Sequence, residues 1–239
     1  VDHISDINLP YTEHSRRYLL SEGIDGKTLF VTGSPMGEVL SVHREKIKDS
    51  DVLERLGLKE RGYLLLSAHR EENVDSEEHF FSLMNAVNDM AEKYRMPVIY
   101  SCHPRSRKRI EERRFAFHPL VRELTPFGFH DYNRLQQSAY CVLSDSGTLS
   151  QESAMLGFAA VLIRTSTERP EVLDKGSLVI GGVKSRDVEQ ALEMAVAMRE
   201  NGEPRVLAED YTDTNVSIKV VKLIQSYAKI VNETVWHKQ

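Results

Sequence analysis

Residues 140–152 read YCVLSDSGTLSQE, and this stretch decides how the rest of the chain is interpreted. An apolar run ends in small polar residues and a glycine, and a helix-like segment follows from Leu149 to Leu156. A strand, a tight turn and a helix in this order direct backbone N–H groups at an anion. Because Gly147 has no side chain, a phosphate can approach the main chain closely. Glu152 lies four residues after Thr148, so its carboxylate can face the same side.

These features fit a nucleotide, with its diphosphate on the backbone amides and its ribose hydroxyls on the carboxylate of Glu152. A Ser-Gly turn before a helix is also a common way to begin a helix without any ligand. Taken alone, the stretch leaves both interpretations open, so the rest of the chain has to decide between them.

Short apolar runs alternate with helical patterns through most of the chain. Strands are predicted at about 63–67, 97–100, 121–124, 140–143, 159–163 and 178–180, with helices between and after them. Buried strands alternating with helices are typical of a parallel sheet covered on both faces. We therefore expect an α/β fold with a doubly wound, Rossmann-like parallel sheet over about residues 27–200, including a further buried strand at 28–32. Helices are also expected from about residue 12 to Gly23, at 36–48, at 51–58 and at 215–232.

Polar side chains follow four of the predicted strands. They lie at 67–71, 101–105, 145–147 and 164–169. In doubly wound folds ligands bind beyond the carboxyl ends of the strands, which is where all four clusters fall. The sequence therefore predicts a cleft for an anionic ligand at this edge of the sheet.

Two histidines and one arginine in these clusters are candidates for contact with the anion. His69 and its neighbour Arg70 can both donate to a phosphate or a leaving group, although a histidine at a strand end can also serve as a cap. His103 lies at the end of the next strand and precedes a proline that restricts its backbone, and its imidazole can contact the ligand or have no part in binding. Arg169 can grip a diphosphate or pair with a neighbouring glutamate. Among the aromatic residues, Tyr132 can flank a base or belong to the core.

The composition excludes several classes of function. A net charge of −5 over 239 residues argues against a broad nucleic-acid-binding surface. The two cysteines, Cys102 and Cys141, have no metal-binding spacing and suit a reducing cytoplasm. No run of 18 apolar residues predicts a membrane span. There is no Ser-His-Asp order, no Walker loop and no evident pair of acid and base carboxylates near the cleft. No metal and no cofactor are expected.

Four motifs together resemble one known family. These motifs are HREEN at 69–73, HP at 103–104, SDSG at 144–147 and TERPE at 167–171. Their order and spacing are similar to those of the UDP-N-acetylglucosamine 2-epimerase family over essentially the whole chain. The opening, DHISDINLPYTE at 2–13, resembles the branch that forms UDP-N-acetyl-L-fucosamine from the corresponding 6-deoxy-L-talose sugar nucleotide.

This resemblance implies a two-domain glycosyltransferase-B arrangement and a role for each candidate residue. Ser146, Gly147 and Thr148 would hold the diphosphate of a UDP-sugar, with Glu152 on the ribose. The resemblance also implies that Arg169 and His69 face the phosphates and the sugar, with His69 as a catalytic candidate, and that the backbone near Tyr132 meets the uracil. Thr148 stands where most relatives have a second glycine, and Gln151 precedes Glu152 where many have a second glutamate.

The implied reaction is C2 epimerisation of a UDP-N-acetyl-hexosamine for bacterial surface polysaccharide synthesis, by elimination and re-addition of UDP. A homodimer in the cytoplasm is also implied. Since the chain begins at Val1 without Met, we expect residues 1–25 to be the end of an N-terminal domain that contains the acid/base carboxylates. Residues 26–204 would be the UDP-binding domain, and 205–239 a helix that packs back on the N-terminal domain. The alternatives are a non-catalytic UDP-binding remnant and a glycosyltransferase of the same architecture.

Overall fold

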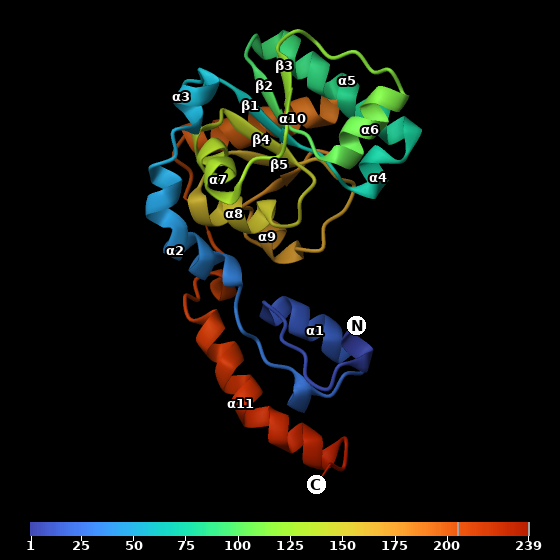
Figure 1. The fold of residues 1–239 in the computed structure, drawn as a ribbon, viewed down its shortest axis with the longest axis vertical. Helices are drawn as coiled ribbons and strands as arrows, with labels where there is room; N and C mark the ends of the chain where they lie inside the picture. The colour runs from blue at the N-terminus through green and yellow to red at the C-terminus, as the bar shows by residue number, and fades with distance from the viewer. Residues whose placement is uncertain (205, 239) are drawn as a thin grey trace. The chain divides into compact units, whose positions relative to one another are not determined.

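The computed structural model describes residues 1–204 and 206–238, and the chain divides into two compact units. One unit comprises residues 44–206, and the other comprises residues 1–43 together with 207–239 (Figure 1). The larger unit contains every site residue predicted from the sequence.

The centre of the larger unit is a six-stranded sheet in which every neighbouring pair is parallel. Its order is β3-β2-β1-β4-β5-β6. The strands are β1 (Leu64–Ser67), β2 (Val98–Ser101), β3 (Val121–Leu124), β4 (Cys141–Ser144), β5 (Ala160–Leu162) and β6 (Val179–Ile180). This confirms the predicted α/β fold and its parallel sheet, and all six strands lie within a residue or two of their predicted positions.

Helices connect and cover these strands (Figure 1). They are α3 (Val52–Leu56), α4 (Glu71–Val74), α5 (Glu77–Tyr94), α6 (Pro104–Glu112), α7 (Phe129–Ser138), α8 (Leu149–Leu156), α9 (Pro170–Asp174) and α10 (Ser185–Glu200). The single turn of α4 was not predicted from the sequence. Ser76 begins α5 by accepting a hydrogen bond from the His79 N–H on its side chain.

The sheet is buried because its strands are apolar on both faces. Alternate residues such as Leu64, Leu66, Leu143 and Val161 pack with the apolar sides of α5 and α10, which lie side by side. Both cysteines are buried in this core as free thiols. The result is a rigid platform whose carboxyl edge holds the polar loops.

The strand order changes direction between β1 and β4. The chain runs outward from β1 through β2 to β3, then returns to β4 and continues to β5 and β6. In doubly wound folds the loops on either side of this point separate and leave a crevice beyond the strand ends. The loop after β1 contains His69, and the loop after β4 contains residues 145–148, so the topology brings two of the predicted clusters together.

The smaller unit contains both ends of the chain. It includes η1 (Asp2–Ile4), α1 (Glu13–Ser21), η2 (Gly26–Thr28), η3 (Glu209–Tyr211) and α11 (Val216–Thr234), while α2 (Pro35–Lys48) spans the boundary with the larger unit. The prediction of a sheet strand at 28–32 was wrong. Leu29 forms an isolated parallel bridge with Asn8, and Phe30 donates a backbone hydrogen bond to the same residue. An apolar run of five residues does not specify which partner it pairs with. Within the described residues, no helix has the length and apolar character needed to cross a membrane.

Candidate nucleotide-binding site

Residues 145–148 between β4 and α8, here named the phosphate turn, use most of their backbone N–H groups within the protein, since Asp145 N–H donates to the Ser67 carbonyl and Thr148 N–H donates to Ser146 Oγ. Ser146 N–H donates to Ser144 Oγ at 3.1 Å, and the hydroxyls of Ser146 and Thr148 are 2.9 Å apart. A Cβ placed on Gly147 would meet only the distal Nη2 of Arg70, at 3.4 Å. Gly147 therefore leaves its backbone accessible from the cleft, next to the amino end of α8, where the helix dipole favours an anion.

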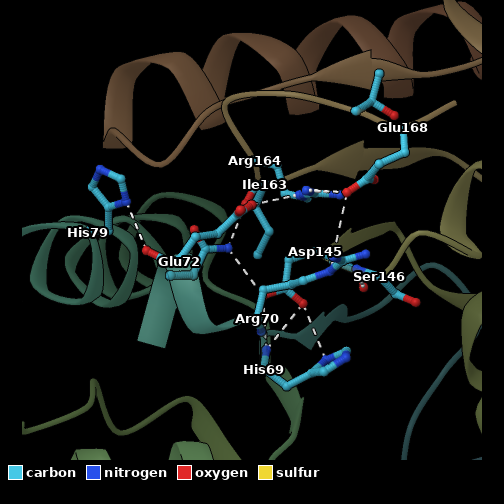
Figure 2. A network of polar contacts seen from close by, with 12 residues as sticks. His69, Arg70, Glu72, His79, Asp145, Ser146, Ile163, Arg164 and Glu168 are labelled. Carbon is cyan, nitrogen blue, oxygen red and sulfur yellow. Dashed lines mark hydrogen bonds and ion pairs between the residues drawn. The ribbon is translucent and has the colours of Figure 1, made fainter. Parts of the chain in front are cut away.

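Asp145 ties the phosphate turn to the loop after β1. Its carboxylate is completely buried and accepts hydrogen bonds from His69 N–H at 2.9 Å and Arg70 N–H at 2.8 Å. The amide of Asn73 donates to the same carboxylate at 3.1 Å and to the Ile163 carbonyl at 2.9 Å (Figure 2). These contacts brace the loop after β1 against the phosphate turn.

The structure brings His69 and His103 together at the cleft. His69 Nδ1 lies 3.3 Å from Asp145 Oδ1, and the His69 side chain is 42% exposed. The ring centroids of His69 and His103 are 6.1 Å apart. His103 also caps α6, since its Nδ1 accepts a hydrogen bond from Arg105 N–H at 3.3 Å. The sequence placed His103 at a strand end beside the cleft, and the structure also makes it the cap of α6.

Glu152 lies in the first turn of α8 and is 7% exposed. Gln136 of α7 donates a hydrogen bond from Nε2 to Glu152 Oε2 at 2.7 Å. Burial raises the pKa of the Glu152 carboxyl, and hydrogen bonds from Gln136 and Thr148 oppose part of that rise. Among the described residues, no Lys, Arg or His side chain forms an ion pair with Glu152.

Tyr132, in the first turn of α7, is half-buried beside the ends of β1 and β4. Burial raises the pKa of its hydroxyl, and hydrogen bonds with Ser67 and Ser144 oppose this rise. Those two serines end β1 and β4, so Tyr132 borders the crevice between the two strands.

A buried cation, Arg164, lies on the side of Asp145 that faces away from His69 (Figure 2). Arg164 follows β5, is 3% exposed, and donates to Glu72 Oε1 at 2.7 Å and to both oxygens of Glu168 at 2.6 and 2.8 Å. The hydrogen bonds from Arg164 lower the pKa of Glu168 to about 2. Arg70 donates from Nε to the Asp145 carbonyl at 3.3 Å, and its Nη1 lies 3.6 Å from Glu168.

Arg169 is the residue before α9, and its N–H donates to Thr167 Oγ1 at 3.0 Å. It therefore follows the segment that Arg164 and Glu168 hold in place. The roles that the resemblance implies for Arg169, His69, Ser146, Gly147, Thr148, Glu152, Tyr132 and His103 concern a bound ligand and stay predictions.

A separate pocket of about 240 Å³ opens at the opposite, amino edge of the sheet. Its lining includes Gly157, Leu178 and Arg199, and none of the predicted site residues. In the part of the chain that the structure describes, no group of three His, Cys, Asp or Glu side chains is arranged to hold a metal ion.

Sequence reasoning assigned no role to three buried polar residues of this region, Asn73, Gln136 and Arg164, although Asn73 and Arg164 lie in the quoted motif and cluster. Each forms its hydrogen bonds with another element, across the sheet edge or between helices. One signal was available for Gln136. It lies on the buried side of α7, one turn after the buried Asn133, at positions where a surface helix usually has apolar residues.

The model of the UDP-N-acetylglucosamine 2-epimerase family matches residues 1–225. The chain belongs to this family. Among curated relatives, the UDP-N-acetylglucosamine 2-epimerases of Methanococcus maripaludis and Methanocaldococcus jannaschii are each 28% identical to it, over 80% and 84% of the chain. The chain spans only 54% and 57% of the length of these two relatives. It aligns with roughly the C-terminal 60% of the homologues.

Solved structures of the family have the same fold. A UDP-N-acetylglucosamine 2-epimerase from Rickettsia bellii is 37% identical, with a TM-score of 0.87 over 99% of this chain and 64% of that one. The M. jannaschii enzyme in complex with UDP-GlcNAc and UDP is 25% identical, with a TM-score of 0.84 over 94% of this chain and 62% of that one. The described chain thus matches one part of the two-domain, glycosyltransferase-B-like fold of these epimerases.

Proposed function

We propose that this chain supplies the UDP-binding part of a UDP-sugar C2-epimerase. The observation that supports this most is the convergence of the phosphate turn, His69 and Glu152 at the point where the strand order reverses. Two relatives of the same fold have been solved with UDP-GlcNAc bound. The diphosphate would lie on the phosphate turn, and the ribose on Glu152.

The proposed reaction breaks the bond between C1 of the sugar and the diphosphate. Elimination across C1–C2 releases UDP and removes the C2 proton, and re-addition of UDP restores the C1 bond after C2 has been reprotonated on the opposite face. The phosphate-turn amides and the imidazole of His69 would stabilise the negative charge that develops on the departing diphosphate. The same groups would also retain UDP until it adds back. This retention is the part of the reaction that we assign to the phosphate turn and His69.

The sugar is proposed from the opening segment. Residues 2–13 resemble the branch that forms UDP-N-acetyl-L-fucosamine, and interconversion of UDP-GlcNAc and UDP-ManNAc is the alternative within the family. Assays with both substrate types, on this chain produced together with the N-terminal part of a family member and followed by proton NMR of C2 exchange in D₂O, separate the two. Exchange on UDP-GlcNAc alone would contradict the fucosamine assignment. A cytoplasmic role in surface polysaccharide synthesis belongs to the same proposal.

We also propose that α11 packs against a further α/β domain, as the resemblance implies. Three of its apolar side chains are well exposed, Ile218 at 55%, Val221 at 66% and Ile224 at 61%. Amide hydrogen exchange of α11 should slow when this chain is produced together with the N-terminal part of a family member. Unchanged exchange would contradict the packing.

Calorimetric titration with UDP tests the central proposal. Saturable binding is expected, and the pair of changes Ser146→Ala and Glu152→Ala should weaken it at least about 100-fold, because each removes hydrogen bonds to charged or buried groups. GDP serves as the ligand control, since it has the same diphosphate and ribose with a different base. The proposal is wrong if UDP does not bind, or if the double variant binds it as tightly as the original chain.

A glycosyltransferase of the same architecture has weaker support. The wall teichoic acid polymerase TagF matches with a TM-score of 0.54 at 11% identity, which is a likeness of fold alone. Transfer of the sugar from a UDP-sugar to an acceptor, with no change at C2, would favour that reading. Saturable UDP binding without turnover of any UDP-sugar would favour the non-catalytic alternative.

A further inference from the structure

Gln136 and Glu152 form a buried polar pair that joins two helices beside the cleft. Gln136 comes from α7 and is 1% exposed, while Glu152 comes from the first turn of α8 and is 7% exposed. The hydrogen bond from Gln136 Nε2 to Glu152 Oε2 is 2.7 Å long. The donor is thus fixed on one oxygen of the carboxylate.

This pair is a poor way to hold two helices together. No lysine or arginine of the described chain forms an ion pair with Glu152, although burial penalises its charge. Gln136 Oε1 is also buried, and no donor in the described part of the chain reaches it. Apolar side chains of similar volume would fill the same space without either cost. Because packing alone does not account for the pair, its carboxylate is expected to serve a ligand.

We propose that Gln136 is a specificity-determining residue, which holds the Glu152 carboxylate so that the site selects ribonucleotides over deoxyribonucleotides. This inference rests on the proposed binding of UDP. A carboxylate has about four lone-pair directions on its two oxygens, and the hydrogen bonds from Gln136 and Thr148 occupy two of them. The remaining directions can accept hydrogen bonds from the 2′ and 3′ hydroxyls of the ribose.

Gln136 would act through Glu152 and not by touching the nucleotide. An amide N–H can only donate, so it keeps Glu152 as an acceptor with a fixed orientation. Methionine has nearly the volume of glutamine but cannot donate, so Gln136→Met removes this control while preserving the packing. Glu152 would then be free to rotate away from the hydroxyls.

The test compares UDP with 2′,3′-dideoxy-UDP, which lacks both ribose hydroxyls, by calorimetric titration. The 239-residue chain is expected to bind UDP at least about 10-fold more tightly than the dideoxy ligand. Gln136→Met should weaken UDP binding about 10-fold and leave dideoxy-UDP binding within about two-fold. Gln137→Met is the matched control, since it makes the same change at an exposed position of the same helix and should alter neither affinity. Thermal unfolding of each variant checks that it is folded.

Glu152→Gln should remove the same preference for UDP over 2′,3′-dideoxy-UDP. Combining it with Gln136→Met should cause no further loss, because both changes act on the contact of Glu152 with the ribose hydroxyls. Equal loss of both ligands in Gln136→Met would show a structural role and overturn the inference, as would unchanged UDP binding. If the original chain binds UDP and dideoxy-UDP equally, the inference fails while the proposed function stands. If it binds neither, the proposed function fails and the inference fails with it.

Discussion

The two ends of the phosphate turn present two buried carboxylates that differ in how many donors surround them. Asp145 is the first residue of the turn and receives hydrogen bonds from two backbone N–H groups and from the Asn73 amide. Glu152 follows the turn by one helical turn and receives side-chain hydrogen bonds from Gln136, at 2.7 Å, and from Thr148. Both side chains lie within a few residues of Gly147, and both are more than nine-tenths buried.

This difference separates a structural carboxylate from one that remains able to bind. The lone pairs of Asp145 are already used, so it fastens the loop after β1 to the loop after β4 and places His69 at the cleft. Glu152 retains unused lone pairs although its burial costs free energy. The contrast predicts that changes at Asp145 mainly affect stability, whereas changes at Glu152 mainly affect ligand binding.

The largest effect is expected from Asp145→Asn. The new NH₂ group would face donors where the carboxylate now accepts, so two or more buried hydrogen bonds would be lost. A decrease in the free energy of unfolding of about 3 kcal/mol is expected, measured by urea denaturation. Asp49→Asn is the control, because Asp49 is exposed, and it should change stability by less than about 0.5 kcal/mol. Equal stability of the two variants would end the distinction between the carboxylates.

The next effect comes from removing one donor from each carboxylate. Asn73→Ala deletes hydrogen bonds to Asp145 and to the Ile163 carbonyl and leaves a small cavity, so it should cost about 2 kcal/mol of stability. Gln136→Met removes one hydrogen bond, conserves volume and eliminates a buried unpaired oxygen, so it should cost less than about 1 kcal/mol. Urea denaturation of the two variants under one set of conditions gives the comparison. A larger loss in Gln136→Met would reverse our assignment of roles.

The elements that position the site could be predicted from the sequence, because each depends on local pattern. The range 149–156 for α8 and the range 121–124 for β3 agree with the structure residue for residue. The position of the phosphate turn follows from them, since it is the segment between β4 and α8. Likewise, the polar clusters after β1 and β4 could be expected to meet, because parallel strands end at one edge of a sheet.

The contacts that distinguish Asp145 from Glu152 could not be predicted in this way. Asn73 and Asp145 are 72 residues apart in the sequence, and no spacing rule connects them. The pairing of Arg164 with Glu72 depends in the same way on the lateral order of the strands. Residues 28–32 show the opposite kind of failure. Their apolar pattern predicted a strand of the sheet, but Leu29 pairs with Asn8 in an isolated bridge.

A smaller effect is expected from changes at Gly147, which lies between the two carboxylates in the sequence. These changes should weaken UDP binding and leave stability unaltered. Gly147→Ala adds a Cβ that meets only the mobile end of Arg70, and Gly147 does not have the positive φ that would strain alanine. Stability should therefore change by less than about 0.5 kcal/mol. The added methyl group would stand where the phosphate approaches the backbone, so UDP affinity should fall about 10-fold in calorimetric titration. Gly147→Val should lower it further, and unchanged affinity in both variants would exclude a diphosphate at this turn.

The smallest effect concerns pH, where Glu152 and Glu168 should behave oppositely. The pKa of Glu152 is raised by burial, so its ionised form destabilises the folded chain at neutral pH, and this cost disappears as pH falls through the raised pKa. Glu152→Gln should therefore be more stable than the original chain at pH 7.5, with an advantage that shrinks toward pH 4.5. The pKa of Glu168 is lowered to about 2 by its hydrogen bonds with Arg164, so its contribution is present above its ordinary pKa of 4.5 and is lost only as pH falls toward 2. The deficit of Glu168→Gln should thus stay constant between pH 7.5 and 5. Urea denaturation of both variants across this range measures the two trends. If the difference in the free energy of unfolding between Glu152→Gln and the original chain did not change with pH, the Glu152 carboxylate would be as fully hydrogen-bonded as that of Asp145.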